Sequence, residues 1–290
     1  MNKKKQYLIT GISLAMLTGI GATGTALAWF STLQSVSVSF SNAEIVTTDN
    51  DLLVSFVSSR NSVMSDETSG SELTLTGLNQ ITDISGDGLS FHKPEWTSYN
   101  SSVAYDISEV GQTVADGYYI DFTINISRSG AGSGGMMVYL GSGTNLVPSS
   151  DPAADEDVRA IEAARLAVIN YDDGSILTGE EEVAMIYAPE IDGESSYQYL
   201  KPNASESAYG FSGYELAVLT NVKDDAFVSY NTYAEASAAS AIAIADLTGA
   251  VESEDVTFRA WIEGTDAEAL NSAIGGVFSI ELNLYGLTVS

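Results

Sequence analysis

The sequence predicts a mainly β protein built as an antiparallel β-sandwich with two or three short helices. Three observations support this class. Many short segments alternate polar and apolar residues with period two, the pattern of a strand with one buried face. Turn-forming Asp, Asn, Gly and Ser residues separate these segments. Hydrophobic residues make up 44% of the chain and aromatic residues 9%, which is enough for a packed core.

The N-terminus has the three parts of a secretory signal peptide, so we expect a signal helix over residues 1–28. Lysines at positions 3–5 form a positive region, and an uncharged apolar run follows over 7–27. Ala26 and Ala28 give the small-x-small pattern that a signal peptidase recognises, and cleavage there makes Trp29 the new N-terminus. A secreted protein with no stable membrane span after cleavage follows from this pattern.

An uncleaved membrane anchor is the alternative interpretation of the same segment. Residues 7–30 are long enough to cross a bilayer, since about 20 apolar residues suffice. Four glycines in the run, the Ala-x-Ala pattern and the lack of positive charge after Phe30 favour cleavage.

The chain beyond the signal is strongly acidic. It carries all 39 acidic residues but only 8 of the 11 basic ones, a formal charge of −31 over 262 residues. Such a surface repels nucleic acid, because phosphate binding needs clustered Lys and Arg. Anionic lipid headgroups are disfavoured for the same reason. Salt or divalent cations relieve the self-repulsion, so a saline or calcium-containing exterior suits this surface.

Cysteine is absent, which excludes disulfides, thiol chemistry and a lipoprotein anchor. Stability must therefore come from packing. We expect residues 29–41 to form an extended arm or first strand and residues 42–290 to form one sandwich domain, because no repeat or linker divides them.

Strands and connections alternate along the first half of the chain. The stretch 59–100 is rich in Ser, Asp and Gly and predicts turns and connections. A Gly/Ser loop over 129–135 predicts a hairpin between the strands on either side of it. The expected strands are 35–41, 43–48, 52–58, 118–126 and 136–140.

The second half contains the expected helices. Ser150, Asp151 and Pro152 suit a helix start ahead of the Ala- and Glu-rich run 153–164. Thr265 and Glu268 have capping-box spacing and predict a short helix from 264. The Ala-rich stretch 233–246 is ambiguous between helix and connection. The expected strands are 166–171, 183–187, 256–263 and 277–284, the first two joined by a turn at 172–174.

Catalytic patterns are missing, so the sequence predicts a protein without enzymatic activity. His92 is the one histidine, and a zinc site or a serine hydrolase needs partners that no motif supplies. We expect it to be a loop residue. A hydrolase that uses His92 or paired acids is the least favoured hypothesis, because carboxylate pairs are unavoidable with 39 acids.

Calcium is the one ion for which the loops offer ligands. No pattern has EF-hand spacing, and ordinary turn chemistry accounts for the same residues. No cofactor is otherwise expected. The candidates for a structural calcium ion are Asp49, Asp51, Asp83, Asp87, Asp172 and Asp173.

Two segments carry a family resemblance. The run Gly24-Thr25-Ala26-Leu27-Ala28-Trp29-Phe30-Ser31, followed by a β-patterned segment, resembles exported bacterial proteins of the TasA/camelysin type, whose SipW-dependent signal is cut by a dedicated signal peptidase. The run Arg259-Ala260-Trp261-Ile262-Glu263-Gly264-Thr265-Asp266 resembles the end of uncharacterised Firmicutes proteins with such signals. Together the two matches cover about 50 of 290 residues.

The resemblance implies a jelly-roll-like domain secreted as a subunit of extracellular or biofilm-matrix fibres. Some relatives assemble by donating an N-terminal strand to the next subunit. The metalloprotease label of camelysin relatives does not transfer, because the chain has one His and no zinc motif. A donated arm would bury the apolar side chains Trp29, Phe30, Leu33, Val36, Val38 and Phe40.

Two functions are therefore expected at the cell surface. The leading one is a structural subunit that associates with itself or with another surface protein. The alternative is a secreted module that binds glycans or surface proteins through aromatic side chains such as Trp96, Tyr99, Tyr105, Tyr197 and Tyr199.

Overall fold

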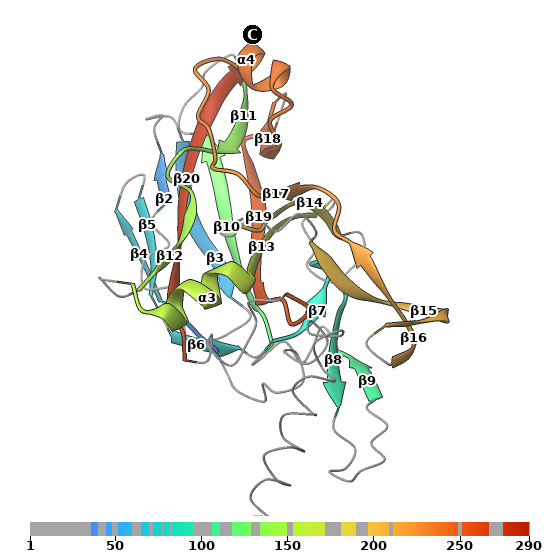
Figure 1. Cartoon of the computed structure of the whole chain (residues 1–290). Helices are drawn as coiled ribbons and strands as arrows, with labels where there is room; N and C mark the ends of the chain where they lie inside the picture. The colour runs from blue at the N-terminus through green and yellow to red at the C-terminus, as the bar shows by residue number, and fades with distance from the viewer. Residues whose placement is uncertain are drawn as a thin grey trace, which may run out of the picture.

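The computed structural model of the chain shows two stacked sheets with a smaller outer layer on one side (Figure 1). It describes residues 36–39, 45–47, 52–59, 65–69, 72–76, 78–81, 83–95, 106–110, 118–128, 134–149, 153–171, 181–189, 197–208, 211–248, 251–266 and 275–289. The signal segment and most of the arm lie outside these ranges. No helix within them is long and apolar enough to cross a membrane.

A six-stranded sheet forms one layer, in the order β17-β14-β13-β19-β10-β3. Its pairs are antiparallel except for the short β14–β17 pair. Its strands are β3 (Leu52–Ser59), β10 (Ile120–Arg128), β13 (Ala164–Tyr171), β14 (Glu181–Tyr187), β17 (Val222–Lys223) and β19 (Ser253–Ile262).

A seven-stranded sheet forms the facing layer, in the order β18-β11-β20-β2-β5-β4, with β12 also paired to β20. Its strands are β2 (Ile45–Thr47), β4 (Ser65–Ser69), β5 (Glu72–Thr76), β11 (Gly135–Leu140), β12 (Asn145–Pro148), β18 (Ala243–Leu247) and β20 (Phe278–Val289). Consecutive strands change sheets from β10 to β11, from β18 to β19 and from β19 to β20.

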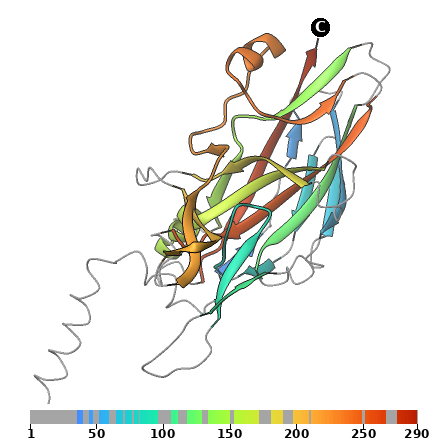
Figure 2. The same ribbon diagram turned by 90° about the vertical axis from the view of Figure 1, so that its right-hand side faces the viewer.

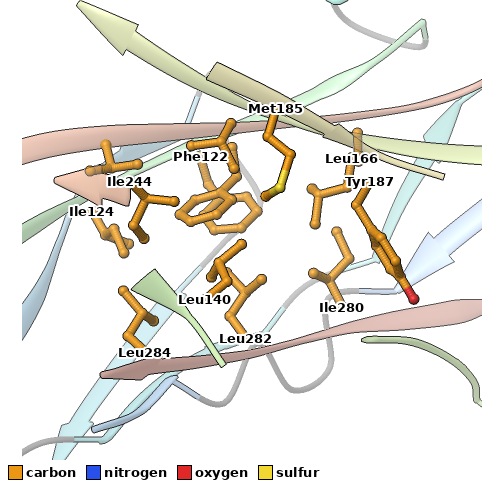
Figure 3. Packing of buried hydrophobic residues seen from close by; sticks show 14 of the residues in the cluster. Phe122, Ile124, Leu140, Leu166, Met185, Tyr187, Ile244, Ile280, Leu282 and Leu284 are labelled. Carbon is orange, nitrogen blue, oxygen red and sulfur yellow. The ribbon is translucent and has the colours of Figure 1, made fainter. Parts of the chain in front are cut away.

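The main core lies between these two sheets. Figure 3 shows Phe122, Leu166 and Met185 of the six-stranded sheet facing Leu140 and Ile280 of the seven-stranded sheet. Helix α3 (Asp155–Ala163) adds Ala160 and Ile161 to the same cluster. Each fully buried Leu, Ile, Phe or Met side chain stabilises the fold by roughly 1.5–3 kcal/mol through removal from water. The expected antiparallel sandwich is confirmed.

The outer layer consists of two small sheets on the other face of the six-stranded sheet, on the side turned toward the viewer in Figure 2. A second core that includes Phe91 and Trp261 joins it to β13, β14 and β19. Its strands are β7 (Ser85–Gly86), β8 (Phe91–Glu95), β9 (Asp106–Glu109), β15 (Gln198–Ala208) and β16 (Phe211–Val218).

Three further elements, β1, β6 and α4, belong to none of the sheets described so far. Strand β1 (Val36–Ser39) pairs antiparallel with β6 (Leu78–Ile81) in a separate two-stranded sheet. Helix α4 (Tyr233–Ala238) precedes β18, and its N-cap Thr232 accepts a hydrogen bond from the Glu235 N–H. The ambiguous Ala-rich stretch is therefore a helix followed by a strand.

Several expected elements have the predicted type. The last strand buries Phe278, Ile280, Leu282 and Leu284 on one face, as the alternation indicates. A helix follows residue 150 as predicted, but its start differs. Its N-cap is Ala154, which makes no side-chain cap, and the acidic residues of the first turn favour the helix dipole instead.

The predicted hairpin around residues 129–135 is wrong. Strand β10 pairs with β3 and β19, whereas β11 pairs with β18 and β20 in the opposite sheet. Residues 120–124 of β10 are buried on both faces, and both edges of the strand are paired within its own sheet. Neither the period-two pattern of the two strands nor the length of the loop between them reveals that the chain crosses from one sheet to the other.

The interpretation of 59–100 as turns and connections is also wrong. This stretch contains strands β4 to β8. Their Ser, Thr and Asp residues weaken the alternation of polar and apolar residues by which a strand is recognised in a sequence. Strand β4, with the sequence SDETS, lies at an edge of its sheet. Polar residues are tolerated in edge strands in general, because the backbone groups along the unpaired edge of such a strand can hydrogen-bond with water.

The helix expected from residue 264 is not seen over the described residues 264–266, which form a turn. The Thr265 hydroxyl lies 2.8 Å from the Gln198 carbonyl oxygen and 2.8 Å from Glu263 Oε1 rather than capping a helix. Glu268 lies outside the described residues.

Candidate functional site

The end of β19 carries the densest group of buried polar side chains in the described structure. Period-two geometry points Phe258, Ala260 and Ile262 into the main core. The alternate residues therefore face the outer layer. Arg259, Trp261, Glu263 and Thr265 all lie on this second face and are all buried.

Glu263 is the centre of this group and is 0% exposed. Its Oε2 accepts from the Gly86 N–H at 3.2 Å and from Trp261 Nε1–H at 3.2 Å. Its Oε1 accepts from the Thr265 N–H at 3.2 Å. Ser85 and Thr265 add hydroxyl hydrogen bonds. Burial raises the pKa of the Glu263 carboxyl, while these hydrogen bonds and the charge of Arg165 oppose the shift.

The same carboxylate ties the outer layer to the sandwich. Ser85, which hydrogen-bonds Glu263, also accepts from the Leu200 N–H at 2.7 Å. The chain around Ile84 joins the end of β19 through Ile84 N–H to Ile262 O at 3.0 Å and Gly264 N–H to Ile84 O at 2.8 Å. We call Ser85, Gly86, Trp261, Glu263 and Thr265 the polar junction.

A buried ion pair lies beside the polar junction. Asp121 of β10 and Arg259 of β19 are directly opposite one another, and two hydrogen bonds of 2.7 and 2.9 Å join them. Arg259 also donates to the Gly88 carbonyl at 2.7 Å and covers the Tyr119 ring at 4.8 Å. Gly88 has φ of 92°, a conformation that favours glycine.

A second buried ion pair joins Arg165 of β13 to Asp266. Arg165 also donates to the Glu162 carbonyl at 3.0 Å and lies over the Tyr197 ring at 5.4 Å. Every polar side chain of the 259–266 segment thus holds two parts of the chain together. The arrangement suits a structural lock better than a reacting centre, because the Glu263 carboxylate is enclosed and fully occupied by donors.

His92 lies in β8, so its placement in a loop is wrong. In the strand ladders His92 lies opposite Ser85 of β7 and Glu109 of β9. The residue is 5% exposed, and its ring packs edge-on against the Tyr214 ring with the ring centroids 5.6 Å apart. Burial lowers the pKa of His92, and the nearby charges of Glu109 and Asp87 oppose the shift. Phe91, buried in the second core, explains why this segment is a strand.

Acidification is expected to destabilise the outer layer through His92. Its folded pKa lies below the unfolded value of 6.5, so between the two values the unfolded chain binds more protons. Stability is therefore full above pH 6.5 and falls as pH drops toward the folded pKa, by at most about 1.4 kcal/mol per pH unit. Urea unfolding of wild type and His92→Gln at pH 7, 6 and 5 measures this. Parallel pH profiles for the two proteins would contradict it.

Two of the six calcium candidates lie in the described ranges. Asp83 is 8% exposed. Asp87 Oδ1 accepts the Leu89 and Ser90 N–H groups at 3.0 and 2.8 Å, which is ordinary turn chemistry. No three His, Asp or Glu residues of the described ranges gather closely enough to hold a metal ion. The candidates outside the described residues are Asp49, Asp51, Asp172 and Asp173.

The expected arm is described only in part. Val36 and Val38 lie in β1, opposite Ile81 and Asn79 of β6. The remaining arm and cleavage residues lie outside the described ranges; these are Ala26, Ala28, Trp29, Phe30, Leu33 and Phe40.

Of the aromatic candidates, only two lie in the described ranges. Tyr197 sits beneath Arg165, whereas Tyr199 lines a surface cleft with Asp87 and Lys201. Trp96, Tyr99 and Tyr105 lie outside those ranges.

Sequence reasoning missed the polar junction, although one signal was present. The residues Arg259, Trp261, Glu263 and Thr265 alternate with apolar ones at the end of a strand. Such alternation normally indicates a solvated face. A tryptophan within it is the clue that this face is covered.

The chain matches no protein-family model, no curated protein and no solved structure.

Proposed function

We propose that this protein is a secreted structural subunit that assembles into extracellular fibres or a cell-surface layer through its N-terminal strand. The observation that carries the proposal is the position of β1. It pairs only with β6 among the described residues, in a two-stranded sheet separate from both large sheets. A strand that is held by a single partner strand can be replaced by the equivalent strand of a neighbouring chain.

Strand exchange supplies the physical basis of assembly. A β1 segment donated by a neighbour recovers the backbone hydrogen bonds to β6 that the chain's own β1 makes. Repeating this head-to-tail contact generates a filament rather than a closed dimer. The apolar residues at 29–33, directly before β1, add burial to each contact.

Charge sets the conditions for assembly. A formal charge of −31 on the 262-residue chain opposes close approach of two copies at low ionic strength. We expect filaments at about 0.15 M salt, where the Debye length is about 8 Å, and more of them with millimolar calcium.

Removal of residues 29–41 is expected to abolish assembly. The measurement is electron microscopy and light scattering of the 29–290 and 42–290 proteins, with and without calcium. A matched pair of variants separates the arm's apolar face from its charge: Val38→Asp should block filaments, whereas Ser37→Asp adds the same charge on the opposite face and should not. Filaments of the 42–290 protein, or a 29–290 protein that stays monomeric throughout, would refute the proposal.

A further inference from the structure

A surface cleft of about 400 Å³ lies between the outer layer and the six-stranded sheet. This volume is within the range of small-ligand sites. Its lining is mixed. The apolar residues are Leu89, Val183, Ile186, Ala217, Val218 and Leu219, and the polar residues are Asp87, Tyr199, Lys201, Thr220 and Asn221.

Three polar groups of this cleft have unused hydrogen-bonding capacity. Within the described part of the chain, neither the Tyr199 hydroxyl nor the Lys201 ammonium group has a hydrogen-bond or ion-pair partner. Asp87 uses Oδ1 for two backbone N–H groups and leaves Oδ2 available. Tyr199 and Asp87 line the same cleft, and burial, followed by the charge of Asp87, raises the pKa of Tyr199.

Lys201 is exposed and lies opposite Glu215 in the β15–β16 ladder, but Glu215 accepts a hydrogen bond from Asn203 instead. The other described cations hold internal contacts: Lys93 donates to the Tyr118 hydroxyl at 2.7 Å, and Arg128 donates to backbone carbonyls. Lys223 is paired with Asp225. Lys201 instead lines a cleft whose aromatic residue, Tyr199, also has a hydroxyl without a hydrogen-bond partner in the described part of the chain.

We propose that this cleft binds one ring of a neutral saccharide. A pyranose has an apolar C–H face and a rim of hydroxyls, and the cleft is lined by apolar side chains, an amphipathic tyrosine, a cationic donor and a carboxylate acceptor. The formal charge of −31 on residues 29–290 disfavours an acidic sugar polymer, so we expect a neutral ligand. The site stands on residues remote from β1 and does not depend on filament assembly.

A second cavity differs from this cleft because its polar groups are already paired with one another. It has a volume of about 300 Å³ and is lined by Tyr139, Lys223, Asp225 and Tyr285, among others. Here the polar groups satisfy one another: Lys223 pairs with Asp225, and the Tyr285 hydroxyl accepts the Tyr230 N–H at 3.3 Å. This cavity therefore provides the matched control.

Isothermal titration calorimetry tests the site on the 42–290 protein, which lacks the arm, and on the 29–290 protein. The probes are β-1,4-linked tetramers of glucose, mannose and N-acetylglucosamine, with a galacturonate tetramer as the anionic comparison. At least one neutral tetramer should bind both proteins. Tyr199→Phe and Lys201→Met should each weaken it about 5–10-fold, since each removes one hydrogen bond. Lys223→Met should not.

Failure of every neutral tetramer at millimolar concentration would overturn the proposal. Unchanged affinity in both Tyr199→Phe and Lys201→Met, or tighter binding of the galacturonate tetramer, would also overturn it. Circular dichroism establishes that each variant is folded, and Tyr199→Phe keeps the ring that packs on the second core. Binding by the 42–290 protein would leave the fibre proposal unaffected, so the two can fail separately.

Discussion

Replacing Glu263 with alanine is expected to lower the free energy of unfolding by about 3–5 kcal/mol. The substitution leaves the buried N–H groups of Gly86, Trp261 and Thr265 without their acceptor. Each unsatisfied buried donor costs roughly 1–3 kcal/mol, and only water entry or local collapse reduces that cost. Since whole domains are stable by only about 5–15 kcal/mol, the variant should be close to unfolding.

Chemical denaturation measures this loss, and two further variants make the result specific. Glu263→Gln keeps the shape but turns an amide NH₂ toward N–H donors, so an intermediate loss of about 2 kcal/mol is expected. Glu281→Ala removes an exposed acid from β20 and should change stability by less than about 0.5 kcal/mol. Equal stability of wild type and Glu263→Ala would show that the polar junction does not hold the layers together.

Replacing Arg259 with methionine is expected to lower the free energy of unfolding by about 3–5 kcal/mol, because the buried carboxylate of Asp121 then loses the cation that balances its charge. The Gly88 carbonyl loses its donor at the same time. The double variant Asp121→Leu/Arg259→Met should recover a large part of the loss, because a buried ion pair can be exchanged for apolar residues at little net cost.

A second polar pair, which serves as a control for the buried ion pair, lies farther along the same two strands. Asn125 of β10 donates to Asp255 of β19 at 2.6 Å, in a partly exposed position. Asp255→Asn should cost less than about 1 kcal/mol, since solvent replaces the lost interaction. If Arg259→Met and Asp255→Asn destabilise equally in urea unfolding, burial is not the source of the effect.

The sequence predicted elements where a local pattern is sufficient. The alternation of Phe278, Ile280, Leu282 and Leu284 predicts a half-buried strand, and the Ala- and Glu-rich run after residue 150 predicts a helix. Both follow from the periods of strand and helix, which depend on neighbours within a few residues. Tyr199 was also among the aromatic candidates. Lys201 lies two residues farther along the same strand, β15, but Asp87 comes from the distant segment between β7 and β8.

Pairing between distant segments could not be predicted in this way. The loop between β10 and β11 has the composition of a hairpin, yet the two strands enter opposite sheets. Strands β4 and β5 are polar enough to pass for loops, and they form because β2 and then β20 provide edges for them. In each case the deciding partner is a backbone edge far along the chain, which side-chain pattern does not encode.

The sequence alone determined the mainly β class, the acidic charge, the absence of cysteine and the expected secretory signal, because these depend on composition and short-range order. Only the tertiary structure decided that the odd-numbered residues at the end of β19 are buried. Gly86 and Glu263 are 177 residues apart, and their hydrogen bond exists only once the outer layer packs on the six-stranded sheet. A carboxylate at a strand end holds two layers of a fold together when hydrogen-bond donors from distant parts of the chain surround it and water is excluded.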